Sequence, residues 1–200
     1  MRRVARVVLV LLVPGALLVV GGLAVVAFMR VRAATATGDP RLDQFRSRVA
    51  LGAVWYWRTV DSALATRVAR AFMAILHQEM LPDWDGRAPV LGDKAIASGP
   101  SVGPGQVLRQ TAVDLGLVPS TETPEAYSAR AADVDWAIDA ALQVFRSKYA
   151  QAGGDLAQAI QLYNGSGPKA EDYRYAALSF AASTWGDGSV APADAGGSEA

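Results

Sequence analysis

The stretch from Leu76 to Leu115 decides the fold, and it opens with Leu76-His77-Gln78-Glu79-Met80 at the end of an apolar helical pattern. It then loosens into a segment rich in Gly, Pro and Asp, passes through Ser101-Val102-Gly103-Pro104-Gly105-Gln106-Val107, and ends at Thr111-Ala112-Val113-Asp114-Leu115. A carboxylate at the end of a buried helix, facing a glycine-rich turn that delivers a glutamine, is a candidate for acid catalysis, and the rest of the chain decides whether it serves as one.

Length and composition exclude several classes of protein. The 200 residues suffice for one ordinary domain plus an appendage, and the formal net charge of zero does not favour a nucleic-acid partner. Without Cys, the chain has no disulfide, no thiolate nucleophile and no Cys-based metal site. A single His, His77, excludes a multi-histidine metal site. Carboxylates therefore remain as the source of catalysis, and we expect no metal and no cofactor.

The N-terminal segment predicts a membrane anchor. Residues 7–29 carry no charged or amide side chain and end at Arg30. About 23 residues at ~1.5 Å each extend roughly 35 Å, enough for a single transmembrane helix. The small residues Ala33-Ala34-Thr35-Ala36 leave a cleaved signal peptide as the alternative, although a signal core is usually shorter than this run. We therefore expect an anchor over residues 1–33 that contacts the lipid bilayer through residues 7–29.

The rest of the chain predicts an all-α body. Helical spacing of apolar residues recurs, and alternating strand patterns do not. Residues 34–59 are predicted as a juxtamembrane helix starting at Asp39-Pro40, residues 60–185 as a helical catalytic domain, and residues 186–200 as a disordered tail. Residues 82–105 are expected to form a long loop. Further helix starts are predicted at Asp61-Ser62, Thr123-Pro124, Asp133 or Asp135, and Asp155.

Three aromatic residues close the first of these helices. Trp55, Tyr56 and Trp57 are interpreted as core or interfacial side chains, with stacking on a sugar as the alternative.

Three blocks together resemble the lysozyme-like superfamily of lytic transglycosylases (SLT-type) and goose-type lysozymes. The apolar helix ending at Glu79 is similar to the family's helix whose terminal Glu is the acid. The turn before Gln106 is similar to the family's Gly-x-Met-Gln turn, with Thr111-Ala112 behind it. The third block is Leu162-Tyr163-Asn164-Gly165-Ser166-Gly167-Pro168, like the family's Ala-Tyr-Asn-Gly-Gly-Pro turn. The resemblance covers roughly residues 60–180.

The chain departs from the family pattern at two positions beside these motifs. Met80 stands where the family usually has Ser, and Gly105 stands where it has Met. The interval between Glu79 and Gln106 is also longer than in the shortest members. The first departure bears on the positioning of the acid more than on its identity.

The resemblance implies that Glu79 is the general acid and base. In transglycosylases this one carboxylate suffices, because the substrate's N-acetyl group assists and a 1,6-anhydro sugar forms. In muramidases of the same fold a water attacks, and a second carboxylate positions it; Asp93, then Asp85 and Asp83, are the candidates. The sequence does not separate the two reactions.

The resemblance also implies a set of substrate-binding residues, and amide side chains suit acetamido and hydroxyl groups. Asn164 has an alternative role as a left-handed cap of its helix beside Gly165. His77, two residues from the acid, points to another helix face and is interpreted as structural. The substrate-binding residues are Ser101, Gly103, Gln106, Tyr163 and Asn164.

We therefore expect a membrane-anchored enzyme that cuts the MurNAc–GlcNAc bond of peptidoglycan glycan strands. Lys and Arg counts around residues 7–29 mildly favour a cytoplasmic body, but peptidoglycan lies outside the cytoplasmic membrane. The expected location is thus a single pass with an extracytoplasmic catalytic domain, or secretion after release of the N-terminal segment. The alternatives are an inactive lysozyme-like module that binds glycan or scaffolds an envelope or phage assembly, and a helical interaction protein.

Overall fold

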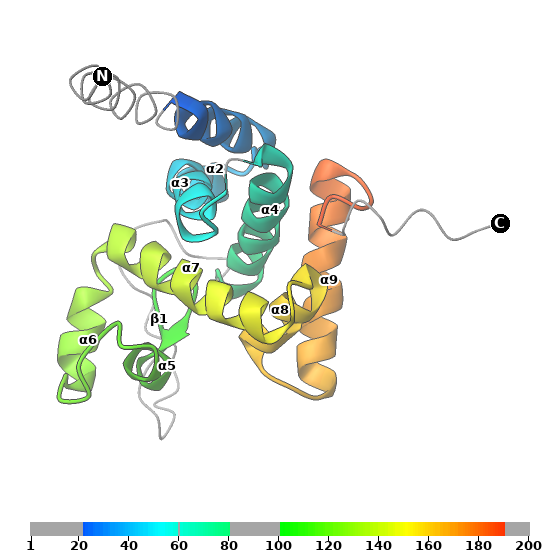
Figure 1. The fold of residues 1–200 in the computed structure, drawn as a ribbon. Helices are drawn as coiled ribbons and strands as arrows, with labels where there is room; N and C mark the ends of the chain where they lie inside the picture. Colours follow the sequence, from blue (N-terminus) through cyan, green and yellow to red (C-terminus); the bar gives the residue numbers. More distant parts are fainter. Residues whose placement is uncertain (1–21, 60, 81–100, 191–200) are drawn as a thin grey trace, which may run out of the picture.

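The computed structural model describes residues 22–59, 61–80 and 101–190, and it confirms the all-α prediction (Figure 1). Within these ranges the only strands are β1 (Ser101–Val102) and β2 (Val107–Leu108), which form a small antiparallel hairpin. Ser101 lies opposite Leu108 and Val102 opposite Val107. The sequence analysis did not predict this hairpin, because two-residue strands are too short to show an alternating pattern.

Helix α4 (Ser62–Glu79) lies at the centre of the molecule. Figure 1 shows it between α3 (Arg46–Tyr56) and α9 (Pro168–Trp185), and it contacts both. Its residues from Ala71 to Leu76 are all fully buried. The helix is therefore enclosed over its last turns, and the chain after Leu76 emerges from the core with Glu79 at its end.

Helix α7 (Val134–Gln151) packs against α3 and against α8 (Leu156–Asn164). The ring of Phe145, on α7, lies 5.9 Å from the ring of Phe72 on α4, measured between centroids. Each such buried aromatic side chain stabilises the fold by about 1.5–3 kcal/mol. The contact fixes α7 relative to the helix that carries Glu79.

Two short helices, α5 (Arg109–Asp114) and α6 (Pro124–Arg130), adjoin the hairpin. The hydroxyl of Tyr127, fully buried on α6, donates a 2.9 Å hydrogen bond to the carbonyl oxygen of Val107 in β2. Beside it, Arg130 forms a 2.7 Å ion pair with Glu122, whose side chain is only 6 % exposed. The Tyr127 bond ties α6 to the hairpin, and the ion pair ties α6 to the segment before it.

The predicted helix starts are confirmed by side-chain capping. Each cap residue accepts a hydrogen bond from a backbone N–H in the first turn of its helix, which satisfies a donor that the helix itself leaves unpaired. At the start of α7 the cap is Asp133 and not Asp135. The other caps are Asp39, Asp61, Thr123 and Asp155.

The single helix expected from Asp39-Pro40 to Trp57 is in fact two helices, α2 (Pro40–Asp43) and α3. The N–H of Phe45 bonds the carbonyl oxygen of Leu42, which tightens the chain at the junction. Leu42, Phe45 and Val49 all lie in the core, where none is more than 4 % exposed. Their spacing of three and four residues fits one helical face, so the sequence pattern continues across the break and does not reveal it.

Helix α3 ends in a Schellman motif at an unusual residue. The N–H of Arg58 bonds the carbonyl oxygen of Trp55, and the N–H of Thr59 bonds that of Val54. Arg58 has a φ of 47°, in the left-handed region where glycine is normally found. A side chain at this position costs about 1 kcal/mol relative to glycine.

The predicted location in a membrane is contradicted by the structure. No helix within the described ranges is long and apolar enough to cross a membrane. The helix over residues 22–34, which contains the end of the predicted span, packs one face on the body of the protein: Ala27 is 3 % exposed and Val31 is fully buried. The remainder of the predicted span, residues 7–21, lies outside the described residues.

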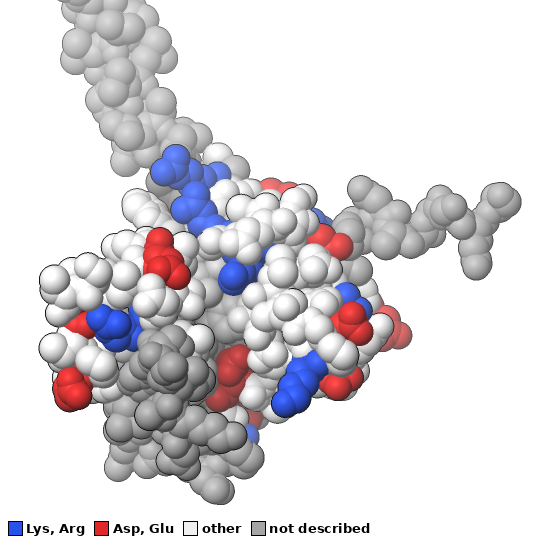
Figure 2. Space-filling view, turned by 90° about the horizontal axis from the view of Figure 1, so that it is seen from below, with Lys and Arg blue, Asp and Glu red and all other residues white. Residues whose placement is uncertain are grey.

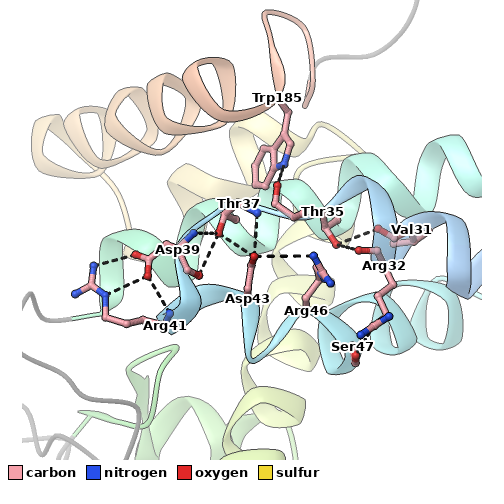
Figure 3. Close-up of polar contacts among 11 residues, drawn as sticks. Val31, Arg32, Thr35, Thr37, Asp39, Arg41, Asp43, Arg46, Ser47 and Trp185 are labelled. Atoms are coloured by element: carbon pink, nitrogen blue, oxygen red, sulfur yellow. Dashed lines mark hydrogen bonds and ion pairs between the residues drawn. The ribbon is translucent and has the colours of Figure 1, made fainter.

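The segment after residue 34 is tied to two helices of the body, and Figure 3 shows the contact with Trp185 of α9. Arg70 Nε, on α4, donates a 3.1 Å hydrogen bond to the carbonyl oxygen of Ala34. Trp185 Nε1, at the end of α9, donates a 2.8 Å bond to that of Ala36. The hydroxyl of Thr35, between them, is buried and donates to the carbonyl oxygen of Val31. We call these three contacts the clasp.

The chain remains packed beyond residue 186, where we expected a disordered tail to begin. Val190 is 3 % exposed and belongs to the core. The hydroxyl of Ser189 donates a hydrogen bond to the carbonyl oxygen of Ala181 on α9. Residues 191–200 lie outside the described residues, and for them the disordered tail stays a prediction.

Candidate active site

Glu79 is the last residue of α4, at the edge of the core. Met80, the next residue in the chain, is the C-cap of the helix, has an extended conformation and packs against the core. Burial of the Glu79 carboxyl raises its pKa to about 7, because the surrounding protein disfavours the charged form. The negative end of the helix dipole acts in the same direction. Glu79 is therefore a carboxyl group that carries a proton in much of the population near neutral pH.

One phenol contacts this carboxyl directly. The hydroxyl of Tyr173, on α9, donates a 2.8 Å hydrogen bond to Oε1 of Glu79. This bond stabilises the carboxylate and so opposes the larger effect of burial on the pKa of Glu79. Burial and the nearby Glu79 charge raise the pKa of Tyr173 far above its ordinary value, so the phenol keeps its proton. Sequence reasoning missed Tyr173.

A cleft of about 400 Å³ opens beside Glu79. It lies between the end of α4, the β1–β2 hairpin, α7 and the end of α8, with Val144 and Lys148 as its contribution from α7. Among the described residues that line it, Glu79 is the only carboxylate. The structure thus brings Glu79 together with four of the residues predicted to bind substrate, namely Ser101, Gln106, Tyr163 and Asn164.

The hairpin turn orients the amide of Gln106. Nε2 of Gln106 donates a 2.8 Å bond to the carbonyl oxygen of Gly103, and Oε1 accepts a 2.9 Å bond from the hydroxyl of Ser101. The backbone N–H of Gln106 bonds the same Gly103 carbonyl, and Gln106 has a φ of 46°. A non-glycine residue in this region carries strain, which tertiary contacts must offset. The amide is therefore held by the turn itself.

Gly105 is enclosed between α7 and α8. A Cβ at this position would lie 2.5 Å from Cβ of Ala141 and 2.9 Å from the hydroxyl of Tyr163. That hydroxyl donates a 2.7 Å bond to the carbonyl oxygen of Gly105. The close approach leaves no space for a side chain at position 105. The hydroxyl of Tyr163 thus bonds the backbone of the turn.

Gly103 was predicted to contact substrate, and the structure places it elsewhere. It is buried, and a Cβ there would lie 2.7 Å from Cβ of Ala137 on α7. It is not among the described residues that line the cleft. Its φ of 73° and its carbonyl oxygen instead build the turn that holds Gln106.

Asn164 is the last residue of α8 and is exposed at the cleft. The alternative role as a left-handed cap falls to Gly165, which has a φ of 128°. The side chain of Asn164 therefore extends toward solvent at the rim, where a ligand can reach it.

His77 points away from the cleft, as its position on the helix predicts. Its ring stacks on Phe180 of α9 with centroids 3.9 Å apart and planes 11° apart. The candidates for a second carboxylate, Asp93, Asp85 and Asp83, all lie outside the described residues. Their place relative to Glu79 stays a prediction.

Charge over the surface is mixed. Figure 2 shows Lys and Arg interspersed with Asp and Glu on a largely uncharged face, and no broad field of one sign is formed by the described residues there. Recognition at the cleft therefore depends on individual groups rather than on a general electrostatic attraction.

No family model, curated protein or solved structure matches this chain. The resemblance to lysozyme-like enzymes accordingly stays a prediction that rests on three sequence blocks. In the structure, the helix end at Glu79 and residues of the other two blocks border one cleft.

Proposed function

We propose that this protein is a lysozyme-like enzyme that cleaves the glycan strands of peptidoglycan, with Glu79 as its general acid and base. The observation that carries the proposal is the environment of Glu79, a carboxyl whose burial raises its pKa to about 7 at the edge of a cleft. A glycosidic oxygen is a poor leaving group until it receives a proton, and an acid of this pKa still holds one near neutral pH.

The reaction assigns two steps to the same carboxyl. In the first, Glu79 gives its proton to the glycosidic oxygen as the bond from that oxygen to the anomeric carbon breaks. In the second, the Glu79 carboxylate removes a proton from the hydroxyl that attacks the anomeric carbon. The Tyr173 hydroxyl, 2.8 Å from Oε1, stabilises the carboxylate between these two steps.

The other cleft groups suit an N-acetylated sugar. Asn164 at the rim offers both a donor and an acceptor, which matches an acetamido group. Lys148 and Thr111 also line the cleft and offer further donors. Apolar Val107 and Leu162 line it as well, and the less polar face of a sugar ring can pack on them.

Two attacking groups fit this scheme. If the attacking hydroxyl is O6 of the same sugar, the product has a 1,6-anhydro end and one carboxylate suffices. If it is water, the product has a reducing end, and a second carboxylate from residues 81–100 is expected to take part.

A zymogram with the full chain tests the proposal. Clearing of embedded peptidoglycan is expected for the unchanged protein and for Glu171→Gln, a control that removes an exposed glutamate on α9. Clearing should be lost in Glu79→Gln. Equal clearing by Glu79→Gln, or none by the unchanged protein, would overturn the proposal. Mass spectrometry of the released muropeptides then separates anhydro from reducing ends.

A second function is a lysozyme-like module that binds glycan without cutting it. The departures from the resembled motifs at Met80, beside the acid, and at Gly105 favour this alternative. Retention on insoluble peptidoglycan without release of soluble fragments is the result expected of that module.

A further inference from the structure

A second cavity, of about 600 Å³, lies away from the cleft. It is formed by the end of α3, by Ala24 on the helix over residues 22–34, and by Arg146 on α7. Lys148, two residues further along α7, lines the cleft instead. Residues two apart on a helix point to nearly opposite sides, so the cavity and the cleft lie on different sides of α7.

The polar groups of this cavity are cationic. Arg58 and Arg146 are both exposed there, and neither forms an ion pair with another described residue. The lining contains no carboxylate among the described residues. Asp139, which faces the nearby Tyr56, already accepts a hydrogen bond from that phenol and pairs with Arg48 at 3.7 Å. Two guanidinium groups are thus available for an anion.

The neighbouring tryptophan has little contact with the protein. Trp55 is 73 % exposed on the last turn of α3, although an indole is among the side chains that gain most from burial. Arg58 follows it in the left-handed conformation that would suit glycine better. An exposed aromatic surface and a strained arginine therefore border the same hollow, as at ligand sites where strain is tolerated.

We propose that this cavity binds the acidic stem peptides of peptidoglycan. Guanidinium groups form paired hydrogen bonds with carboxylates, which the stem peptides carry and the neutral positions of the glycan backbone do not. The face of Trp55 packs against the apolar part of the same peptide. This inference rests on the proposed function for its choice of ligand. Because the cavity lies across α7 from the cleft, it holds a stem peptide of the wall while the cleft cuts glycan.

Binding of a purified disaccharide tetrapeptide to the full chain, measured by calorimetry in the Glu79→Gln background, tests the inference. Arg146→Gln and Arg58→Gly are each expected to weaken binding roughly tenfold, the effect of one lost charge-assisted pair. Lys169→Gln, which removes an exposed charge on α9, should bind like the Glu79→Gln parent. The neutral disaccharide of two N-acetylglucosamine units, which carries no carboxylate, should show no difference among these variants.

Arg58→Gly separates binding from folding. Glycine relieves the left-handed strain, so the melting temperature should rise by about 2–4 °C while the affinity falls. Equal affinity of the parent, Arg58→Gly and Arg146→Gln would overturn the inference.

The failure of this inference and that of the proposed function are distinguishable. With Glu79 intact, Arg146→Gln should leave cleavage of peptide-free glycan unchanged and slow the release of fragments from intact wall. If the arginine variants bind the ligand as tightly as the parent, while clearing still requires Glu79, the stem-peptide site alone is overturned. Arginine-dependent binding without any clearing would overturn the enzyme and leave the site.

Discussion

The hydroxyl of Tyr173 donates a 2.8 Å hydrogen bond to Oε1 of Glu79, joining the end of α4 to α9. Two opposed effects meet at this carboxyl. Burial raises its pKa, and the phenol lowers it by a smaller amount, which leaves a pKa of about 7. An acid that must give up a proton and later recover it works best when its pKa lies near the ambient pH.

Tyr173→Phe should raise the pKa of Glu79 further, because the bond that stabilises the carboxylate is removed. The alkaline limb of the pH–rate profile should then move to higher pH, with maximal clearing reduced roughly tenfold. Tyr175→Phe, on the same helix and 60 % exposed, is the matched control and should keep the profile of the unchanged protein. A limb that stays in place would show that the phenol does not act on this titration.

Glu79 should also make stability depend on pH. Its pKa is about 7 in the folded protein against an ordinary value of 4.5, so the unfolded chain ionises first as pH rises. Below pH 4.5 Glu79 is protonated in both the folded and the unfolded chain, and it causes no loss of stability. Between pH 4.5 and 7 stability falls, by roughly 3 kcal/mol in total.

Glu79→Gln should therefore gain stability relative to the unchanged protein as pH rises through that window. Urea unfolding of both proteins at about pH 4.5 and about pH 8 measures the difference, and the other carboxylates cancel in the comparison. A constant difference between the two pH values would contradict the raised pKa.

Gly105→Ala should disturb the hairpin turn. Its new Cβ would lie 2.5 Å from that of Ala141, so α7 or the turn must shift. Overpacking of this kind typically costs about 1–3 kcal/mol of stability. The shift also weakens the hydrogen bond that the Tyr163 hydroxyl donates to the carbonyl oxygen of residue 105. Gly22→Ala, where nothing lies within 4 Å, serves as the control and should be neutral or stabilising. Thermal unfolding compares the two.

Trp185→Phe should loosen the clasp without emptying the core. The indole N–H bond to the carbonyl oxygen of Ala36 is lost, at a cost of about 1 kcal/mol. Amide exchange should then accelerate over residues 27–37 while α7 stays protected. Uniform acceleration through both segments would indicate global destabilisation, with no particular role for the contact.

Local sequence signals predicted the parts of the fold that local chemistry determines. The caps Asp61, Thr123 and Asp155 were identified from their residue types, because the bond each makes lies within its own first turn. Glu79 was placed at a helix end by the apolar spacing before it. These predictions needed no knowledge of the tertiary structure.

The features that were missed depend on distant contacts. Tyr173 is separated from Glu79 by 94 positions, and no spacing within α9 distinguishes it from Tyr175. The break between α2 and α3 was missed because Leu42, Phe45 and Val49 keep the spacing of one helical face across it. Gly103 was assigned to the cleft because its distance from Ala137 is invisible in the sequence.

The clasp has a mechanical consequence. Arg70 and Trp185, which hold the backbone at Ala34 and Ala36, belong to α4 and α9. These are the same two helices that carry Glu79 and Tyr173 at their contact. A pulling force applied to the chain at residue 22 is thus shared by these two helices and by α3, which the Arg32 guanidinium contacts through the hydroxyl of Ser47. Tension on the N-terminal side would be transmitted as shear between the acid and the phenol that stabilises its carboxylate.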